Sequence, residues 1–468
     1  MVMQPAAKRN AMKSARSKVS NASVAANVND LLLDAGMPLS ISRLVCDLLG
    51  ATTNPCSLEE ALWDLSYMKT SPRLFLFDRT CPQQALEDAC LFRGTGRHLY
   101  GRKNEMSALF NAKKKVSAHV QEDVENSATS LSFSSQGIGN QFLCEAVYLQ
   151  GYAGAGKSSL MRSVVDACKE DNWFILECKF EKEKRIDISL AFNNFFGKCH
   201  QVLMNKSELE NSPLVRSYQS ICRTIFAVFD MAGLIELFDL IPNLAHVYPT
   251  RIAKARNQRN ISSMDKVGSG EQRRFHMFRL LFKSLCSAGR PVLLALDDLQ
   301  WAGPFSMEFL EGFLEYMHAT PSSVVRNARR KGLLILGAYR SNEVEADGDL
   351  MNRVDSIKQS GNANFMTLTV GEVPKDDINK LISAKLCLPR RYTQELSEIV
   401  HSKTKGNAFF VVEFVRSIIQ NKCLQFSVRS RRWVWDNDAI LMSTISDGVA
   451  ELLLSSFHQL PRRVMQTL

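Results

Sequence analysis

Organised cysteines and long apolar runs are both missing from this sequence. Its 12 cysteines are scattered, and no two of them form a C-x-x-C pair. That spacing argues against a zinc site or a disulfide framework and favours a reducing compartment. No apolar stretch approaches the roughly 18 residues that are needed to span a bilayer. We therefore expect a soluble, cytoplasmic protein with no membrane partner.

The first 28 residues lack acidic side chains and apolar periodicity. Half of the net charge of +10 lies there, on Lys8, Arg9, Lys13, Arg16 and Lys18. Without an apolar h-region this segment is not a secretory signal. Its composition is typical of a disordered tail, residues 1–28. An organelle transit peptide, which is also basic, rich in serine and poor in acids, is the minority interpretation.

The remaining chain is long enough, and at 45% hydrophobic residues apolar enough, for two to four domains with real cores. Residues 29–95 are typical of a small helical lead-in segment, with a capping box at Ser57–Glu60. We place the main domain at 96–345, with a polar loop at 113–139, and a hinge and helical lid at 346–422. Residues 423–468 are expected to form a hairpin and the start of a winged-helix-like domain, cut off by the chain end.

Gly151 to Ser158 carry the strongest motif. The stretch GYAGAGKS fits the phosphate-loop pattern G-x-x-x-x-G-K-[ST] at every fixed position. A strand-like run precedes it and a helix-like run follows, so loop amides and a helix N-terminus would face one anion. Lys157 would reach the β- and γ-phosphates, and the Ser158 hydroxyl would bind Mg²⁺. The predicted nucleotide-binding residues are Gly151, Tyr152, Ala153, Gly154, Ala155, Gly156, Lys157, Ser158 and Ser159.

Two acids end a second apolar run, at 291–298. PVLLAL followed by Asp297 and Asp298 is typical of a central parallel strand that delivers carboxylates to the edge where a phosphate loop lies. Asp297 would hold Mg²⁺, directly or through water. Asp298 is placed to orient the attacking water. A solvated Asp-Asp turn is the simpler alternative.

A third buried run, Gly332 to Tyr339, ends in Arg340. Since parallel neighbours end on one rim, Arg340 could meet the γ-phosphate, although a solvated strand-end arginine is also open. Further on, 424–435 is typical of a β-hairpin. Its basic and aromatic residues suit either nucleic acid or a packed aromatic face, and the second is favoured. They are Arg429, Arg431, Arg432, Trp433 and Trp435.

These motifs together resemble the AAA-type ATPases of the origin-recognition-like group, and within it the signal-transducing STAND subgroup. LDDLQWA at 296–302 is close to that group's DDLQWAD, and GNAFF at 406–410 to its GNPFF. The resemblance implies an α/β P-loop NTPase fold, a mostly parallel sheet flanked by helices and followed by a helical lid. It also implies that Tyr100 and Arg102 lie near the adenine, and that Arg340 senses the γ-phosphate.

Gly303 and Ala408 depart from the family pattern, in place of an acid and a proline. The second departure weakens the prediction of base recognition.

The resulting expectation is an ATP- and Mg²⁺-binding conformational switch with slow hydrolysis. Its catalytic residues would be Lys157, Asp298 and Arg340, and its metal ligands Ser158 and Asp297. Protein partners would bind through the lid, the lead-in or further C-terminal domains, and an oligomer is compatible with the class. A DNA-associated origin-recognition-type ATPase and a non-hydrolysing nucleotide-binding scaffold remain as alternatives.

Overall fold

The chain divides into two compact units. A computed structural model describes residues 28–50, 56–70, 72, 99–129, 142–183, 187–204, 213–247, 270–319, 331–345, 348–386, 388–427 and 432–442. One unit is Arg102–Gly371, and the other joins Met1–Gly101 to Glu372–Leu468. The second unit is therefore discontinuous in sequence, because the first is inserted into it.

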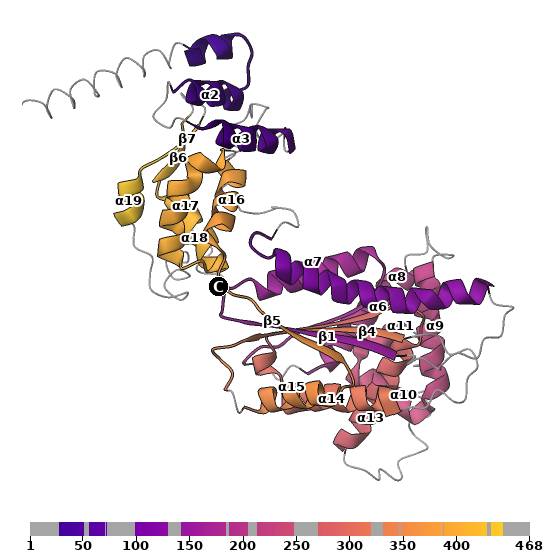
Figure 1. Cartoon of the computed structure of the whole chain (residues 1–468). Helices are drawn as coiled ribbons and strands as arrows, with labels where there is room; N and C mark the ends of the chain where they lie inside the picture. The colour runs from indigo at the N-terminus through magenta and orange to yellow at the C-terminus, as the bar shows by residue number, and fades with distance from the viewer. Residues whose placement is uncertain are drawn as a thin grey trace, which may run out of the picture. The chain divides into compact units, whose positions relative to one another are not determined.

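Five parallel strands form the sheet of the unit Arg102–Gly371. Their order is β2-β3-β4-β1-β5 (Figure 1). The strands are β1 (Phe142–Gly151), β2 (Phe174–Lys179), β3 (Val292–Asp297), β4 (Lys331–Arg340) and β5 (Asn364–Thr369). The expected P-loop NTPase fold with a mostly parallel sheet is confirmed. Because the strands run parallel, β1, β3 and β4 end on the same edge.

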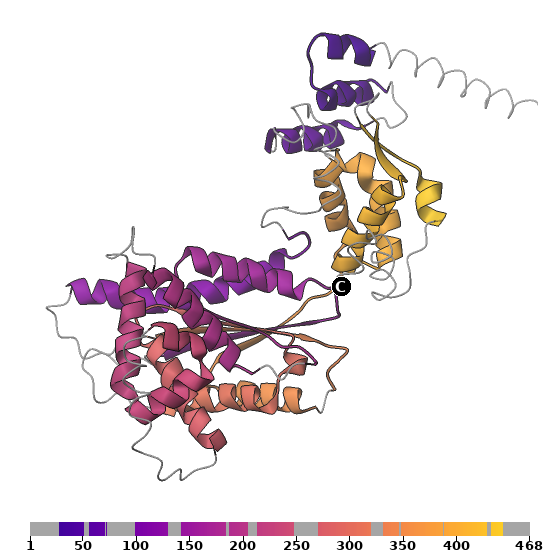
Figure 2. The ribbon, with the colours of Figure 1, turned by 180° about the vertical axis from the view of Figure 1, so that it is seen from behind.

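Helices cover both faces of this sheet. On one face lie α6 (Lys103–Thr129) and α7 (Lys157–Glu170); on the other lie α13 (Gly270–Cys286), α14 (Pro304–Ala319) and α15 (Asp349–Gln359). Figures 1 and 2 show these two layers from opposite sides. Double coverage explains why the strands are almost wholly apolar, as in β3, where Val292 to Leu296 are at most 3% exposed.

Four further helices follow β2 and enlarge the core. They are α8 (Ser189–Met204), α9 (Pro213–Val228), α10 (Met231–Leu240) and α11 (Pro242–Val247). Phe192, Phe195 and Phe196 of α8 are buried, as the sequence pattern predicts. Phe192 packs edge-on against Phe282 of α13, with ring centroids 5.7 Å apart. The long stretch between β2 and β3 therefore adds helical core to the sheet.

The prediction of a polar loop at 113–139 is wrong for 113–129, and the rest of that segment lies outside the described residues. Helix α6 continues to Thr129. Leu109, Ala112, Val116 and Val120 recur at helical spacing and are at most 6% exposed. This narrow stripe faces β1 and β4, and a Cβ atom added at Gly332 would lie 2.8 Å from Val116. The lysines beside the stripe hide it in the sequence: Lys114 and Lys115 are exposed, and Lys113 pairs with Asp171.

The hinge predicted from residue 346 also falls elsewhere. Strand β5 pairs with β1 over Glu145–Gln150, and Val370 N donates to Gln150 O at 2.7 Å. The sheet is therefore complete only at β5, and the first unit extends to Gly371. A strand at the edge of a sheet carries no local sign of its partner, which is why the sequence pattern assigned this segment to the following domain.

In the second unit, helices from both ends of the chain lie together. It contains α2 (Leu39–Leu48), α3 (Leu58–Thr70), α16 (Lys375–Leu386), α17 (Arg390–Thr404), α18 (Ala408–Gln420), β6 (Leu424–Ser427), β7 (Arg432–Trp435) and α19 (Asn437–Met442). The expected hairpin is present as the antiparallel pair β6–β7. Leu424 and Trp433 of the hairpin share one core with Phe414 of α18. Hairpin and lid helices thus pack as one body.

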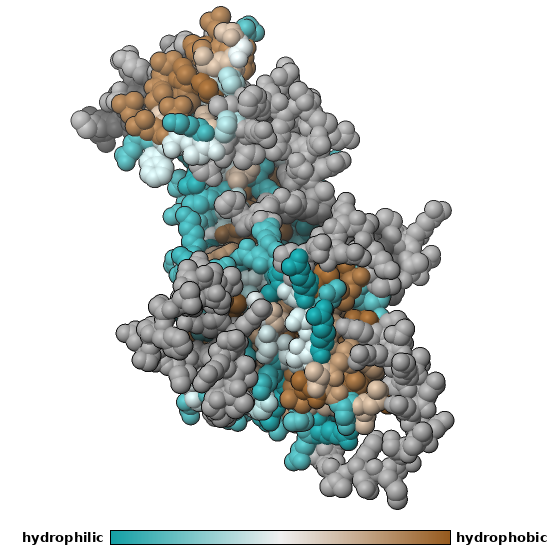
Figure 3. All heavy atoms as spheres, turned by 90° about the vertical axis from the view of Figure 1, so that its right-hand side faces the viewer, coloured by the Kyte–Doolittle hydropathy of each residue, from teal (hydrophilic) through white to brown (hydrophobic). Residues whose placement is uncertain are grey.

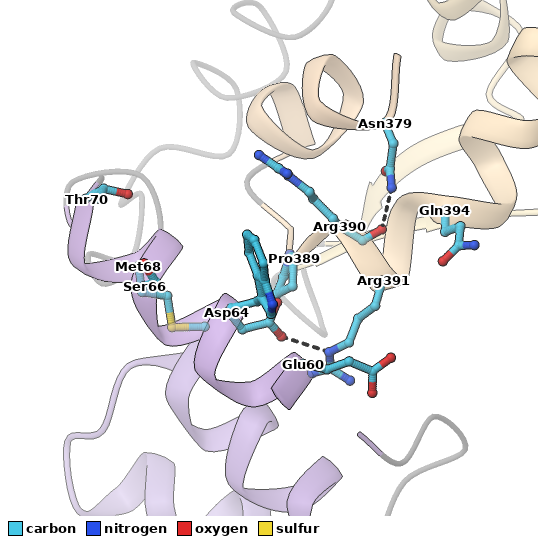
Figure 4. A pocket seen from close by; sticks show the side chains of 11 residues that line it. Glu60, Asp64, Ser66, Met68, Thr70, Asn379, Pro389, Arg390, Arg391 and Gln394 are labelled. Atoms are coloured by element: carbon cyan, nitrogen blue, oxygen red, sulfur yellow. Dashed lines mark hydrogen bonds and ion pairs between the residues drawn. The ribbon is translucent and has the colours of Figure 1, made fainter. Parts of the chain in front are cut away.

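A buried charge network fastens α2 and α3 to α17. Arg391 donates to Asp64 at 2.8 Å and also pairs with Asp47, which accepts from the Tyr392 hydroxyl as well. Figure 4 shows Asp64 and Arg391 meeting at a cavity of about 390 Å³ between α3 and α17. Asp47 is 0% exposed. The lead-in helices α2 and α3 therefore belong to the same unit as α17, the predicted lid helix.

The start of α3 confirms the predicted capping box. Ser57 N donates to the Glu60 carboxylate at 2.8 Å, and Glu60 N donates to Ser57 Oγ at 3.3 Å. The Ser57 hydroxyl also donates to the Glu60 carboxylate at 3.0 Å, and the hydrogen bonds from the backbone N–H and the hydroxyl of Ser57 lower the pKa of Glu60.

Large apolar side chains gather on the surface of α2 and α3. Figure 3 shows hydrophobic atoms concentrated at the top of the view, where these helices lie. The exposed residues from this region are Leu31, Leu48, Leu49, Leu58, Leu62, Trp63 and Leu65.

Within the described residues, no helix is both long and apolar enough to cross a membrane. All nine cysteines among those residues are free thiols.

Candidate functional site

Glycines shape the loop between β1 and α7. Gly154 and Gly156 have φ values of 76° and 98°, a region that side chains other than glycine rarely adopt. Gly156 is the N-cap of α7, so the turn delivers the chain directly into the helix. The amides of the first helical turn have no partner inside the helix, and together with the helix dipole they favour an anion.

Gly151 is required for a different reason. A Cβ atom at this position would lie 2.4 Å from the carbonyl oxygen of Val370, the residue after β5. That oxygen belongs to the backbone and cannot rotate away. The first glycine of the motif is thus set by the close approach of the fifth strand.

Lys157 lies within the loop. Its ammonium group donates to the carbonyl oxygens of Gly151 at 2.8 Å and Tyr152 at 2.9 Å, and the residue is only 7% exposed. Burial lowers the pKa of Lys157, and the nearby Arg340 guanidinium lowers it further. The cation is therefore held where anionic oxygens at the loop would stabilise it.

The two predicted metal ligands touch each other. Ser158 Oγ donates to Asp297 Oδ2 at 2.8 Å, although 139 positions separate them in the chain. A hydroxyl and a carboxylate are the hard oxygen donors that Mg²⁺ takes in nucleotide sites, with phosphates and water completing the shell. Among the described residues, no group of three or more His, Cys, Asp or Glu could hold a metal by itself. This pair fits Mg²⁺ that is shared with a phosphate ligand.

Asp298 is held in a strained conformation between two cations. Its φ of 57° is left-handed, and it is 8% exposed. Its Oδ1 lies 3.4 Å from Arg340 Nε, and its Oδ2 lies 3.7 Å from Lys179 Nζ. Strained non-glycine residues cluster at functional sites. Lys179 is absent from the sequence prediction; its one signal is its place at the end of β2, in register with Asp297.

Arg340 is surrounded by three further groups. Its Nη1 donates to Glu343 at 2.7 Å, its guanidinium lies 4.7 Å from the Trp301 ring centre, and its backbone N–H donates to Gln300 at 3.2 Å. The sequence motif contains Gln300 and Trp301 without indicating what they do. Glu343 is missed altogether, because it lies after β4 in a polar turn with no pattern of its own.

Arg102 supports the loop from behind. Its Nη2 donates to the carbonyl oxygens of Ala155 at 2.9 Å and Gly371 at 2.5 Å, and the side chain is buried. Arg102 therefore links the loop to the end of the unit, and its place near the adenine stays a prediction. Tyr100, the other predicted adenine residue, belongs to the second compact unit.

A groove of about 450 Å³ opens beside Ser158 and Asp297. Charged side chains from α7 and β2 line it, including Arg162, Lys169 and Lys179. The metal-ligand pair is therefore accessible from solvent. Of the predicted residues, the structure brings together Ser158, Asp297, Asp298, Lys157 and Arg340 at one edge of the sheet. Tyr152 is 68% exposed on the loop.

Comparison with known proteins identifies the domain. Residues 138–325 match the family described as "AAA ATPase domain". The hybrid signal transduction histidine kinase G of Dictyostelium discoideum is 23% identical over 429 residues, which is 79% of this chain and 11% of that protein. The peroxide stress-activated histidine kinase mak2 of Schizosaccharomyces pombe is 22% identical over 301 residues, 63% of this chain and 12% of that protein. The chain thus spans about a ninth of the length of these relatives.

Solved structures with similarity to the chain include the Aeropyrum pernix ORC2 protein in ADPNP and ADP complexes. It has 12% sequence identity and a TM-score of 0.34, with 78% of this chain and 73% of that chain covered. Cdc6p from Pyrobaculum aerophilum has 11% identity and a TM-score of 0.33, with 72% and 66% covered. Because both TM-scores are low, the similarity to these structures adds nothing to what the strand order and the glycine loop already show.

Proposed function

Because residues 138–325 match the AAA ATPase domain family, we propose that this chain binds ATP with Mg²⁺ and acts as a slowly hydrolysing conformational switch in signalling. The observation that carries the proposal is the 2.8 Å contact between Ser158 and Asp297. It joins the end of the glycine loop to the end of the acidic strand. Two oxygen donors next to an anion-binding helix N-terminus suit a metal-bound triphosphate.

Each residue at the edge of the sheet has a distinct task in this proposal. The loop amides and Lys157 bind the phosphates, and Ser158 and Asp297 hold the metal. When bound, Mg²⁺ neutralises charge on the phosphate oxygens. Asp298 orients the attacking water, and Arg340 responds to the terminal phosphate. Arg102 keeps the loop backbone in place.

Slow turnover is supported by the state of Asp298. An aspartate is one methylene shorter than the glutamate of fast AAA machines, so it holds a water less well. It is also engaged by Arg340 and Lys179, at 3.4 Å and 3.7 Å. Both cations compete with water for the carboxylate oxygens. We therefore expect turnover below about 1 s⁻¹, at the low end for enzymes.

The switch role is supported by the two-unit organisation. The chain passes between the units only at Gly101–Arg102 and Gly371–Glu372, so a change at the nucleotide has two covalent routes to the lid unit. Arg102 touches both the loop and Gly371, at one of these crossings. Similarity to two histidine kinases favours a signalling context. Protein partners and an oligomer belong to this proposal as well.

Calorimetry of ATP binding, with and without Mg²⁺, tests the proposal. Lys157→Ala removes charge-assisted hydrogen bonds that are worth roughly 1.5–3 kcal/mol, so we expect affinity to fall about 10- to 100-fold. Lys114→Ala is the matched control, because Lys114 is an exposed lysine of α6 that does not line the groove beside Ser158 and Asp297. Equal affinities for the wild type and Lys157→Ala would refute nucleotide binding at this loop.

A non-hydrolysing scaffold is the second candidate, and the pairing of Asp298 with two cations is the observation that favours it. Single-turnover hydrolysis by the wild type and by Asp298→Ala separates the two. No hydrolysis by the wild type would support the scaffold, whereas hydrolysis that is lost in Asp298→Ala would support the switch. The DNA-associated alternative loses support because Trp433 is 6% exposed. Arg429 and Arg431 lie outside the described residues, and salt-dependent DNA binding by the wild type would revive it.

A further inference from the structure

The guanidinium of Arg340 is enclosed on three sides. Asp298 Oδ1 lies 3.4 Å from Nε, Glu343 Oε1 lies 2.7 Å from Nη1, and the Trp301 ring faces the guanidinium carbon at 4.7 Å. The side chain of Arg340 is 28% exposed. Two carboxylates therefore compensate one cation, while an aromatic face fixes its plane.

Gln300 ties this enclosure together. Its Nε2 lies 3.3 Å from Asp298 Oδ1 and 3.2 Å from Glu343 Oε2, so one amide donates to both carboxylates. Its Oε1 accepts the backbone N–H of Arg340 at 3.2 Å. All of the polar groups of this side chain are thus used to hold Arg340 and its partners.

A phosphate that approaches Arg340 must compete with these carboxylates. Each carboxylate satisfies guanidinium N–H groups that an anion would otherwise use, and each repels a second anion nearby. Lys157, whose pKa the Arg340 charge helps to lower, is the neighbouring cation. The strength of the Glu343–Arg340 ion pair therefore affects how much Arg340 contributes to the binding free energy of a terminal phosphate.

We propose that Glu343, Gln300 and Trp301 are positioning residues that retain Arg340 on carboxylates, and that Glu343 thereby sets the preference of the site for ATP over ADP. The inference rests on the proposed function, because it presumes that nucleotide binds at the loop. ADP lacks the phosphate that would reach Arg340, so the retention weakens ATP binding and leaves ADP binding unchanged. Glu343 is a selectivity control for this site.

Glu343→Gln tests the proposal, since it removes the charge and keeps the shape. The readout is the ratio of the dissociation constants for ADP and a non-hydrolysable ATP analogue, measured by calorimetry with Mg²⁺. A partly exposed ion pair contributes up to about 1 kcal/mol, so the ratio should rise roughly two- to fivefold. The rise should shrink at high salt, because the pair is screened. Glu345→Gln, two residues away on the same turn, should leave the ratio unchanged.

Two further variants make the outcome decisive. Arg340→Ala should remove the contribution of Arg340 to the ratio of the two dissociation constants. In that background, Glu343→Gln should cause no further change in the ratio. An unchanged or lower ratio in Glu343→Gln, with a melting temperature equal to the wild type's, overturns the inference. If the wild type binds neither nucleotide, the proposed function fails instead, and the two failures are distinct.

Discussion

At Gly151 the loop and the far edge of the sheet meet without room for a side chain. The obstacle is a backbone oxygen, that of Val370, at 2.4 Å from the position of a Cβ atom. Relief would require β5 to move away from β1. A single methyl group added at Gly151 would therefore disturb both the loop and the pairing of β1 with β5.

Gly151→Ala should lower the free energy of unfolding by about 1–3 kcal/mol, as overpacking does. It should also weaken nucleotide binding, because the loop is displaced. Chemical denaturation and calorimetry measure the two effects. Gly303→Ala is the control, since a Cβ atom there meets nothing within 4 Å. Equal stabilities for the two variants would show that β5 yields at little cost.

Single residues differ in how far the sequence exposes their roles. Ser158 and Asp297 could be paired in advance, because each ends a motif and parallel strands bring such ends to one edge. Lys179 and Glu343 could not. Their roles come from register and from a turn, and neither leaves a spacing in the chain. The hydrogen bonds of Arg102 to Ala155 and Gly371 could not be predicted either, because they depend on where the backbone runs.

At the scale of elements, the presence of the strands was easier to predict than their pairing in the sheet. The sequence predicts four of the five strands within a residue or two of their observed bounds, but the run expected at 146–150 misses the first four residues of β1 (Phe142–Gly151). The pairing of β5 with β1 could not be predicted from the sequence. β5 is an edge strand whose residues are exposed or half-buried, and nothing in that local pattern indicates its partner. Helix α6 was hidden by its lysines, although Leu109, Val116 and Val120 mark its buried side.

The connection between α17 and the lead-in helices depends on Arg391. Arg391→Met would leave Asp47, which is 0% exposed, without its guanidinium partner. Breaking a buried pair by removing one partner costs about 3–5 kcal/mol. We expect urea denaturation of the variant to show a loss of that size in the lid unit, and proteolysis to cut within α2 or α3 first.

A second variant, Asp64→Asn, tests the contribution of the other carboxylate that Arg391 contacts. Burial raises the pKa of Asp64 above its ordinary value of 3.8, against the opposing effect of Arg391. The folded protein therefore binds this proton more tightly than the unfolded chain does. Between the raised pKa and 3.8, Asp64 makes the wild type more stable as pH falls.

The stability of Asp64→Asn relative to the wild type should thus be highest at neutral pH and decline on acidification through that window. Urea midpoints of both proteins at several pH values give this difference directly. A difference that grows towards acid pH would contradict the raised pKa. A loss at pH 7 as large as that of Arg391→Met would show that Asp64, and not Asp47, carries the network.

At the scale of the whole molecule, the order of the chain misrepresents its domains. Residues near both ends build one unit, and the unit Arg102–Gly371 lies between them. Domain assignment from the sequence divides such a chain into consecutive segments, as in the prediction of a main domain at 96–345. Only three-dimensional pairings, such as that of Asp47 with Arg391, reveal that the lead-in belongs with the lid.

The strand order also decides when this protein can fold during synthesis. Strand β1 lies between β4 and β5, which end at 340 and 369. A nascent chain must therefore keep β1 without neighbours until nearly two hundred more residues have left the ribosome. A fragment confined to 138–325 would hold β1, β2 and β3 but neither partner of β1. We expect it to aggregate on expression, whereas 102–371 gives a cooperative melting transition, and a well-folded shorter fragment would disprove this.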